Sequence, residues 1–145
     1  MIRYAQGKTI VWKRKEKLLR VVPYLDSLVL DDKEAAFVTG HDNPRRAAYD
    51  LYDKGASCVA VTQANKGSLL LIHGQDYTIP AYPPLNLVDT TGAGDSYTAG
   101  LLKARELFDN SRQQGEFAAM TATMCIENHG PFRGTTDEVL QRLDE

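Results

Sequence analysis

The chain has 145 residues, of which 43% are hydrophobic and 25% charged, a composition typical of one soluble globular domain with its own core. Its net charge of −2, with both signs spread along the chain, gives no reason to expect binding to nucleic acid or to an anionic membrane. The apolar runs are too short to span a membrane, and residues 2–15 lack the apolar centre of a signal peptide, so we expect a cytoplasmic protein.

The first half of the chain alternates between strand and helix patterns. The predicted elements are a strand over 8–13, a helix over 14–25, a strand over 27–32, and helices over 32–40 and 43–55. Pro23 ends or kinks the first helix, and Gly40 closes the second. Asn43 as a cap, with Pro44 at the first helical position, predicts the start of the third.

The second half begins with strands and ends with helices. We predict strands over 57–63, 68–74 and 76–82, then helices over 92–108, 112–127 and 135–145, the last capped by Thr136. A turn at Gly74-Gln75 joins the last two strands. This order predicts an α/β fold with a mostly parallel sheet, in which ligands bind beyond the carboxyl ends of the strands, near helix N-termini.

The two cysteines indicate no metal site. Cys58 and Cys125 lie far apart in apolar surroundings, and neither belongs to a pattern that binds zinc. We therefore predict two buried free thiols, which fits a reducing compartment.

Residues 87–100 read LVDTTGAGDSYTAG and place two glycines at the start of a predicted helix. Gly92 and Gly94 weaken that start by up to ~2 kcal/mol, because glycine costs ~1 kcal/mol against alanine inside a helix. A helix N-terminus presents unpaired N–H groups and partial positive charge, and glycine lets an oxyanion approach the backbone closely. The stretch therefore predicts a phosphate site. It matches neither G-x-x-x-x-G-K-[ST] nor G-x-G-x-x-G, so a dehydrogenase of the Rossmann type ranks last among the alternatives.

Asp95 follows the glycines directly and has two interpretations. An aspartate in a first helical turn can simply complement the helix dipole. Beside an anion site, however, a carboxylate can take the proton of a substrate hydroxyl that attacks a phosphoryl group. The preceding Asp89-Thr90-Thr91 and the two glycines favour the second interpretation.

This stretch resembles the ribokinase-like, or PfkB, family of carbohydrate kinases, whose signature D-T-x-G-A-G-D is met without departure by residues 89–95. The resemblance implies that Asp95 is the catalytic base and that Gly92, Ala93 and Gly94 form the anion hole. It also implies that Asp89 and Thr91 shape the loop and contribute to a site for a monovalent cation such as K⁺.

Two further segments match the family pattern in part. The family's N-x-x-E motif, whose glutamate helps to organise Mg²⁺, reads Asp31-Asp32-Lys33-Glu34, so that Glu34 matches and would act through water. A charged helix start is the plain alternative for this stretch. The nucleotide strand-turn T-x-G-x-x-G reads Thr62 to Gly67, with Ala64 where glycine is usual.

A third segment, residues 118–132, resembles the helix and turn that flank the adenine in the family. Asn128 and Gly130 are the residues that would line the nucleotide there. An ordinary helix C-cap at Gly130 is an equal alternative.

The resemblance runs from about Asp26 onward and covers only the C-terminal half of the family's fold. It implies a single partial domain over 1–145, half of a ribokinase-like three-layer sandwich, without the N-terminal sugar-binding and lid parts. The implied function is ATP- and Mg²⁺-dependent phosphorylation of a hydroxyl on a sugar or related alcohol. The alternative is a nucleotide-binding remnant without catalysis. A sheet that lacks strands exposes an edge and apolar surface, so we also expect a homodimer or a complementing chain.

Overall fold

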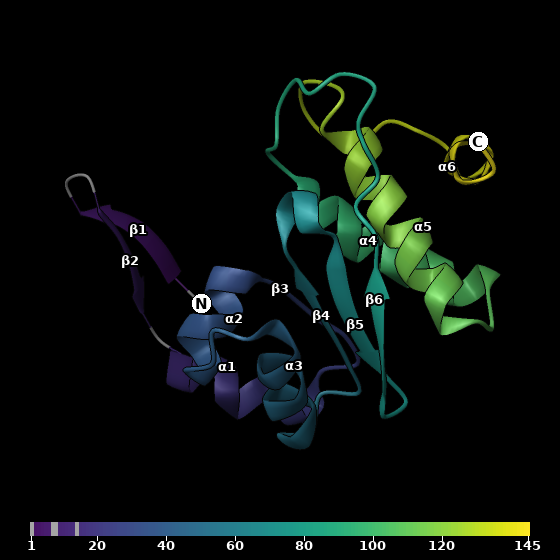
Figure 1. Ribbon diagram of the computed structural model, residues 1–145. Coiled ribbons are helices and arrows are strands. Elements are labelled where there is room, and N and C mark those ends of the chain that lie inside the picture. Colours follow the sequence, from purple (N-terminus) through teal and green to yellow (C-terminus); the bar gives the residue numbers. More distant parts are fainter. Residues whose placement is uncertain (1, 7–8, 14) are drawn as a thin grey trace.

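The structure, a computed structural model, describes residues 2–6, 9–13 and 15–145, with side chains from residue 15 onward. Strands β1 (Ile2–Gln6) and β2 (Thr9–Lys13) form an antiparallel hairpin. The strand predicted over 8–13 is thereby confirmed for 9–13, whereas β1 was not predicted and residue 8 lies outside the described residues. In Figure 1 this hairpin extends away from the rest of the molecule.

The central sheet has four strands in the order β3-β4-β5-β6. Their bounds are Leu28–Asp31, Cys58–Thr62, Ser68–Ile72 and Gln75–Ile79. Only β3 and β4 pair in parallel, while β4 with β5 and β5 with β6 are antiparallel. The prediction of a mostly parallel sheet is therefore wrong.

The lengths of the connections explain this sheet. A parallel pair needs a crossover of a dozen or more residues, and only the helical segment between β3 and β4 provides one. Residues 63–67 link β4 to β5, and His73 and Gly74, with φ of 52° and 75°, form the tight turn between β5 and β6. The hairpin was predicted correctly, but its turn was predicted at Gly74-Gln75, one residue later than the observed turn.

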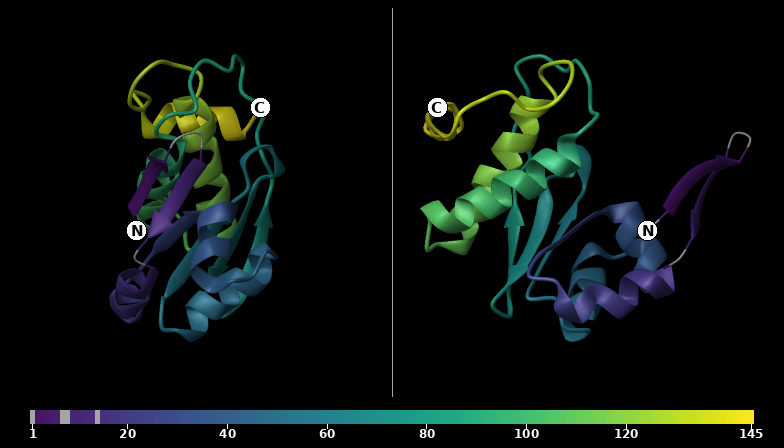
Figure 2. Two further views of the ribbon diagram at one scale, coloured as in Figure 1. Left: turned by 90° about the vertical axis from the view of Figure 1, so that its left-hand side faces the viewer. Right: turned by 180° about the vertical axis from the view of Figure 1, so that it is seen from behind.

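Helices cover both faces of the sheet and form three layers (Figure 1). The bounds are α1 Lys15–Val21, α2 Asp32–Thr39, α3 Pro44–Asp53, α4 Ala93–Leu107, α5 Ser111–Cys125 and α6 Thr136–Leu143, with short 3₁₀ turns at Val22–Tyr24 and Ala64–Lys66. Figures 1 and 2 show α1 to α3 on one side of the sheet and α4 with α5 on the other. No helix in the described part of the chain is both long and apolar enough to cross a membrane.

Local signals set the helix ends largely as predicted. Asn43 accepts the amide of Arg46 at the start of α3, and Gly40 closes α2 with a φ of 80°. Pro23 lies in the 3₁₀ turn that ends the first helical segment. The cap of α6 is Thr135 rather than Thr136, because a capping box pairs Thr135 with Glu138.

Two cores lie on opposite faces of the sheet. Val59, Val61, Leu69 and Leu71 face α2 and α3, whereas Cys58, Ala60, Leu70 and Ile72 face α4 and α5. The alternation follows from the two-residue period of a strand. Because both faces are covered, β4 and β5 are apolar along nearly their whole length. Both cysteines are buried and free, as predicted.

The pairing of α4 with α5 positions the residues of the predicted site. A Cβ at Gly100 would lie 2.8 Å from the Thr121 hydroxyl oxygen and 3.0 Å from the Ala118 Cα, so glycine allows the two helices to pack closely. As a result, the start of α4 and the end of α5 are held at the same end of the molecule (Figure 1).

Candidate functional site

The N-terminus of α4 has the geometry of an anion site. Gly92 is the N-cap with a φ of 83°, a left-handed conformation that glycine adopts without strain, and no side chain caps the helix. A Cβ at Gly94 would meet no atom within 4 Å, so the space beside this backbone is open. Among the first amides of α4, Ala93 N–H is partly engaged, because it donates a long hydrogen bond of 3.3 Å to the Thr90 carbonyl.

Asp95 lies in the first turn of α4 and is exposed. Within residues 15–145 its carboxylate has no hydrogen bond or salt bridge. With Gly92, Ser96, Ala99, Pro131 and Phe132 it lines an open depression of about 350 Å³. An unengaged carboxylate beside an uncapped helix start is free to accept a proton from a bound hydroxyl.

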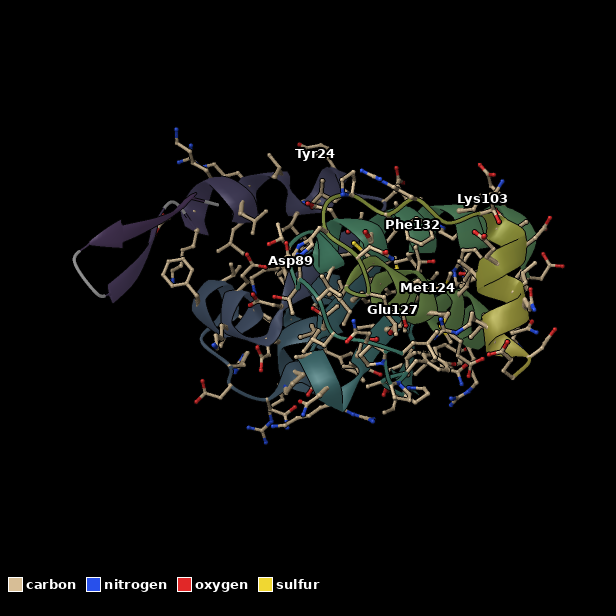
Figure 3. The ribbon with its side chains drawn as sticks, turned by 90° about the horizontal axis from the view of Figure 1, so that it is seen from above. Tyr24, Asp89, Lys103, Met124, Glu127 and Phe132 are labelled. Atoms are coloured by element: carbon tan, nitrogen blue, oxygen red, sulfur yellow. The ribbon has the colours of Figure 1, made fainter. Side chains whose placement is uncertain are left out.

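A second depression, of about 330 Å³, lies at the end of α5. Its lining residues are Met124, Cys125, Glu127, Asn128, His129, Pro131, Phe132, Arg133, Gly134 and Glu138. Pro131 and Phe132 line both depressions, so the two adjoin. Figure 3 shows Met124, Glu127 and Phe132 at this end of the molecule, beside Asp89. An elongated ligand can therefore extend from the end of α5 to the start of α4.

Backbone hydrogen bonds join the loop that carries the signature to the end of α5. The Ile126 carbonyl accepts from Val88 N–H at 2.9 Å and from Asp89 N–H at 3.2 Å. The Asp89 carboxylate accepts from Thr91 N–H at 2.9 Å, and this hydrogen bond is the main reason that the pKa of Asp89 is lowered. His129 Nδ1 lies 4.0 Å from the same carboxylate.

Glu127 connects three segments around the second depression. Its carboxylate accepts from Leu85 N–H at 2.8 Å and from both terminal nitrogens of Arg142, at 3.1 and 3.2 Å. Its side chain is only 11% exposed. Burial raises the pKa of Glu127, but the hydrogen bonds from Arg142 and Leu85 outweigh it and leave the pKa lowered. This carboxylate therefore holds the loop before α4, the turn after α5, and α6 together.

The structure brings some of the predicted site residues together. Gly92 and Asp95 line the first depression, Asn128 lines the second, and Gly130 lies in the turn between Asn128 and Pro131 with a φ of 87°. Ala93 and Gly94 form the first turn of α4 between Gly92 and Asp95.

Other predicted residues lie outside both depressions. Thr62 ends β4, and Gly67 has a structural role, because a Cβ there would lie 2.1 Å from the Ile79 carbonyl oxygen. Ala64 adopts a φ of 51°, in the left-handed region that favours glycine. Glu34 forms a capping box with Asp31, in which the Asp31 N–H donates to Glu34 Oε2 at 3.0 Å.

Neither Glu34 nor Asp89 belongs to a cluster of acidic, histidine or cysteine side chains that could hold a metal ion. Among the described residues, no group of three or more histidine, cysteine, aspartate or glutamate side chains could hold a metal ion.

Sequence reasoning missed Phe132, Glu127 and Arg142. Pro131 and Phe132 follow Gly130 in the segment that resembles the adenine-flanking turn, so that segment pointed toward them. No signal links Glu127 to Arg142, because they are 15 residues apart and meet only through the packing of α6 against α5.

Comparison with known proteins identifies the family. The model of the pfkB family of carbohydrate kinases matches residues 7–137. The chain belongs to this family. It is 27% identical over 147 residues to a nucleoside kinase of Methanocaldococcus jannaschii, covering 100% of this chain and 48% of that protein. It is 34% identical over 92 residues to a cytidine kinase of Thermococcus kodakarensis, covering 62% of this chain and 33% of that protein.

Solved structures agree with the family assignment and with the ribokinase-like fold. The ribokinase of Arabidopsis thaliana, complexed with ribose and ATP, superposes with a TM-score of 0.78 at 27% identity, covering 88% of this chain and 43% of that one. The nucleoside kinase of M. jannaschii gives a TM-score of 0.77 at 26% identity, covering 91% and 44%. The chain thus spans about half the length of these pfkB relatives.

The interaction of Glu127 with its partners predicts a pH-dependent stability. Because the folded state lowers its pKa, Glu127 stabilises the fold above its ordinary pKa of 4.5, and this contribution is lost as the pH falls below it. Glu127→Gln should lower the free energy of unfolding at pH 7 by about 1–2 kcal/mol, and the difference from the parent should shrink toward pH 3. Urea unfolding across this pH range measures both quantities.

The matched control is Glu106→Gln, which removes the exposed partner of Lys103 on α4 and should leave the stability nearly unchanged. A Glu127→Gln variant that is as stable as the parent at pH 7 would show that the interaction does not hold these segments together.

Proposed function

We propose that this chain is the nucleotide-binding and phosphoryl-transferring half of an ATP-dependent kinase that acts on a hydroxyl of a sugar or nucleoside. The uncapped start of α4, with the unengaged Asp95 carboxylate in its first turn, is the observation that carries this proposal. Membership of the pfkB family supports it. Relatives named as nucleoside kinase, deoxyribokinase and ribokinase indicate the substrate class.

In this proposal ATP lies across the two adjoining depressions. The adenosine end occupies the depression at the end of α5, beside Asn128 and Gly130, and the phosphates extend to Gly92 and Gly94. The resemblance assigns Thr62 and Gly67 to the same nucleotide, although Gly67 is also needed for its turn. The shared Phe132 lies between the two ends.

The transfer step follows from the charges at the start of α4. The oxygen of the acceptor hydroxyl forms a bond to the γ-phosphorus of ATP while the bond from that phosphorus to ADP breaks. Asp95 accepts the proton that this hydroxyl loses. The backbone amides of Gly92 and Gly94, with the partly engaged amide of Ala93 and the positive end of the helix dipole, stabilise the charge on the transferring group. Aspartate is a weak base, which suffices because the alcohol proton leaves late in phosphoryl transfer.

In this proposal Mg²⁺ would be held mainly by the nucleotide phosphates and water. Mg²⁺ would neutralise phosphate charge, and Glu34 would contact it through water. Asp89 and Thr91 are the proposed contributors to a site for a monovalent cation. The buried free thiols and the need for ATP favour a cytoplasmic location.

The half-length match favours a second candidate, a nucleotide-binding remnant that does not catalyse transfer. Calorimetric titration with Mg²⁺ and ATP, beside a phosphorylation assay over sugars and nucleosides, separates the two. Binding together with turnover supports the kinase. Binding without turnover on any alcohol supports the remnant, and no binding contradicts both.

Gly94→Ala tests the anion site directly. The new Cβ meets no protein atom within 4 Å, and alanine is the better helix former, so the free energy of unfolding should stay equal or rise by up to about 1 kcal/mol. The same methyl group stands beside the proposed phosphate position and prevents the close approach of phosphate to the backbone. It should therefore weaken ATP binding by roughly tenfold or more. Calorimetry and urea unfolding measure the two effects.

The control for that substitution is Glu106→Ala, at an exposed position near the end of the same helix, which should leave ATP affinity unchanged. Equal ATP affinity in Gly94→Ala and the parent would exclude phosphate binding at this backbone.

Asp95→Asn tests the proposed base. The amide has the volume of the carboxylate but cannot take the proton, so the turnover should fall by about 10²–10⁴. The affinity for ATP should be kept or increased, because the substitution removes a negative charge beside the phosphates. Steady-state kinetics on an accepted substrate, with calorimetric titration of ATP, checks both, and near-parental turnover rules out this role for Asp95.

A further inference from the structure

The Thr91 carbonyl, in the loop before α4, meets a side chain of α5. Cys125, the last residue of α5, is 1% exposed, and its thiol donates a long hydrogen bond of 3.9 Å to the Thr91 oxygen. A Cβ on Gly92 would lie 3.8 Å from the same sulfur, so the thiol also packs against the N-cap of α4. Within residues 15–145 no backbone N–H donates to this carbonyl, so the thiol is its hydrogen-bond partner there.

The direction of the Thr91 carbonyl decides the direction of the next amide. Thr91 and Gly92 share one trans peptide unit, in which the C=O and N–H bonds point in opposite directions. Because the carbonyl is directed at Cys125, the Gly92 N–H points away from that sulfur, and it has no acceptor within residues 15–145. The Gly92 amide is one of those that the proposed function assigns to the transferring phosphate.

Glycine does not itself hold this peptide unit in place. Gly92 has a φ of 83° and a ψ of 0°, and glycine adopts a negative φ about as readily. Rotation of the Thr91–Gly92 peptide plane to a negative φ would bring Gly92 close to helical geometry and add it to α4. Thr91 would then be the N-cap, a position that favours threonine.

This alternative helix start would close the proposed anion site. The Thr91 carbonyl would accept from Asp95 N–H, four residues on, and the Thr91 hydroxyl would be placed to cap Gly94 N–H. In the structure no side chain caps α4, and neither amide donates to Thr91. A thiol is a weak donor, but glycine leaves the two directions close in backbone energy, so a weak hydrogen bond suffices to select one.

We propose that Cys125 is a positioning residue, which keeps the start of α4 open for phosphate by holding the Thr91 carbonyl. Asp89 assists from the same loop, since its carboxylate accepts Thr91 N–H at 2.9 Å. The thiol is carried by α5, whose close packing at Gly100 fixes its place relative to α4. The consequence for phosphate binding rests on the proposed function, whereas the direction of the carbonyl is independent of any ligand.

The other cysteine provides a matched control. Cys58 is also free and 1% exposed, and it lies in β4, on the sheet face that packs against α4. Removal of either thiol leaves a small cavity of the same kind in the core, whereas it is Cys125 that donates to the Thr91 carbonyl.

The direct test is the residual dipolar coupling of the Gly92 amide, which reports the direction of this N–H bond in the weakly aligned, ligand-free chain. Cys125→Ala should change the coupling, because the donor is lost. Cys125→Ser, which keeps a donor, should restore it, and Cys58→Ala should leave it at the parent value. The couplings of residues 98–107, further along α4, show whether each variant keeps its fold.

Binding of tripolyphosphate is the second measurement. In Cys125→Ala the affinity should fall by roughly threefold to tenfold, because only the fraction of molecules with an open helix start binds the anion. Cys125→Ser and Cys58→Ala should bind as the parent does.

A Gly92 coupling that is the same in Cys125→Ala and the parent would overturn the proposal. So would a change that Cys125→Ser fails to reverse, because the thiol would then act through its volume rather than as a donor. A changed coupling with parental tripolyphosphate affinity would overturn the link to the anion site. A parent chain that binds no tripolyphosphate contradicts the proposed function but leaves the amide direction measurable, so the two failures are distinct.

Discussion

The close packing of α4 against α5 is the constraint on which the rest of the site depends. Gly100 lets the helices approach until Thr121 and Ala118 would touch any added side chain. This contact brings the first turn of α4 next to the last turn of α5, so that the Ile126 carbonyl can accept the amides of Val88 and Asp89. The proposed phosphate-binding backbone at the start of α4 and the proposed adenosine depression at the end of α5 are therefore brought together by one closely packed pair of helices.

Around this pair, polar contacts hold the loops while the chemical groups stay free. Glu127 is engaged by Leu85 and Arg142, and Asp89 is engaged by Thr91. By contrast, Asp95 is unengaged and Gly92 and Gly94 carry no side chain over the helix start. This division between occupied carboxylates and one free carboxylate is what a base beside an anion site requires.

Much of this arrangement could be predicted from local sequence. Asn43, Pro44 and Gly40 marked helix ends because capping depends on neighbouring residues alone, and the Gly-Ala-Gly stretch marked the start of α4 for the same reason. Strand patterns alone do not give the direction of β5, but the short 63–67 connection does: it lies between the two predicted strands and is too short for a parallel crossover, so the mostly parallel prediction overlooked it. The contact of Glu127 with Arg142 depends on how α6 packs, which no local pattern encodes. Gly67 matched a nucleotide motif, yet its neighbours show that the turn itself needs glycine.

The most direct test of the account is a titration of the ¹⁵N-labelled chain with Mg²⁺ and ATP, followed by the backbone amide signals in NMR spectra. The account predicts that the largest changes fall on Gly92, Gly94 and Asp95, with a second group around Asn128. Tripolyphosphate should reproduce the first group without the second. Saturable changes in other amide signals, with the signals of residues 92–95 unchanged, would contradict phosphate binding at the start of α4.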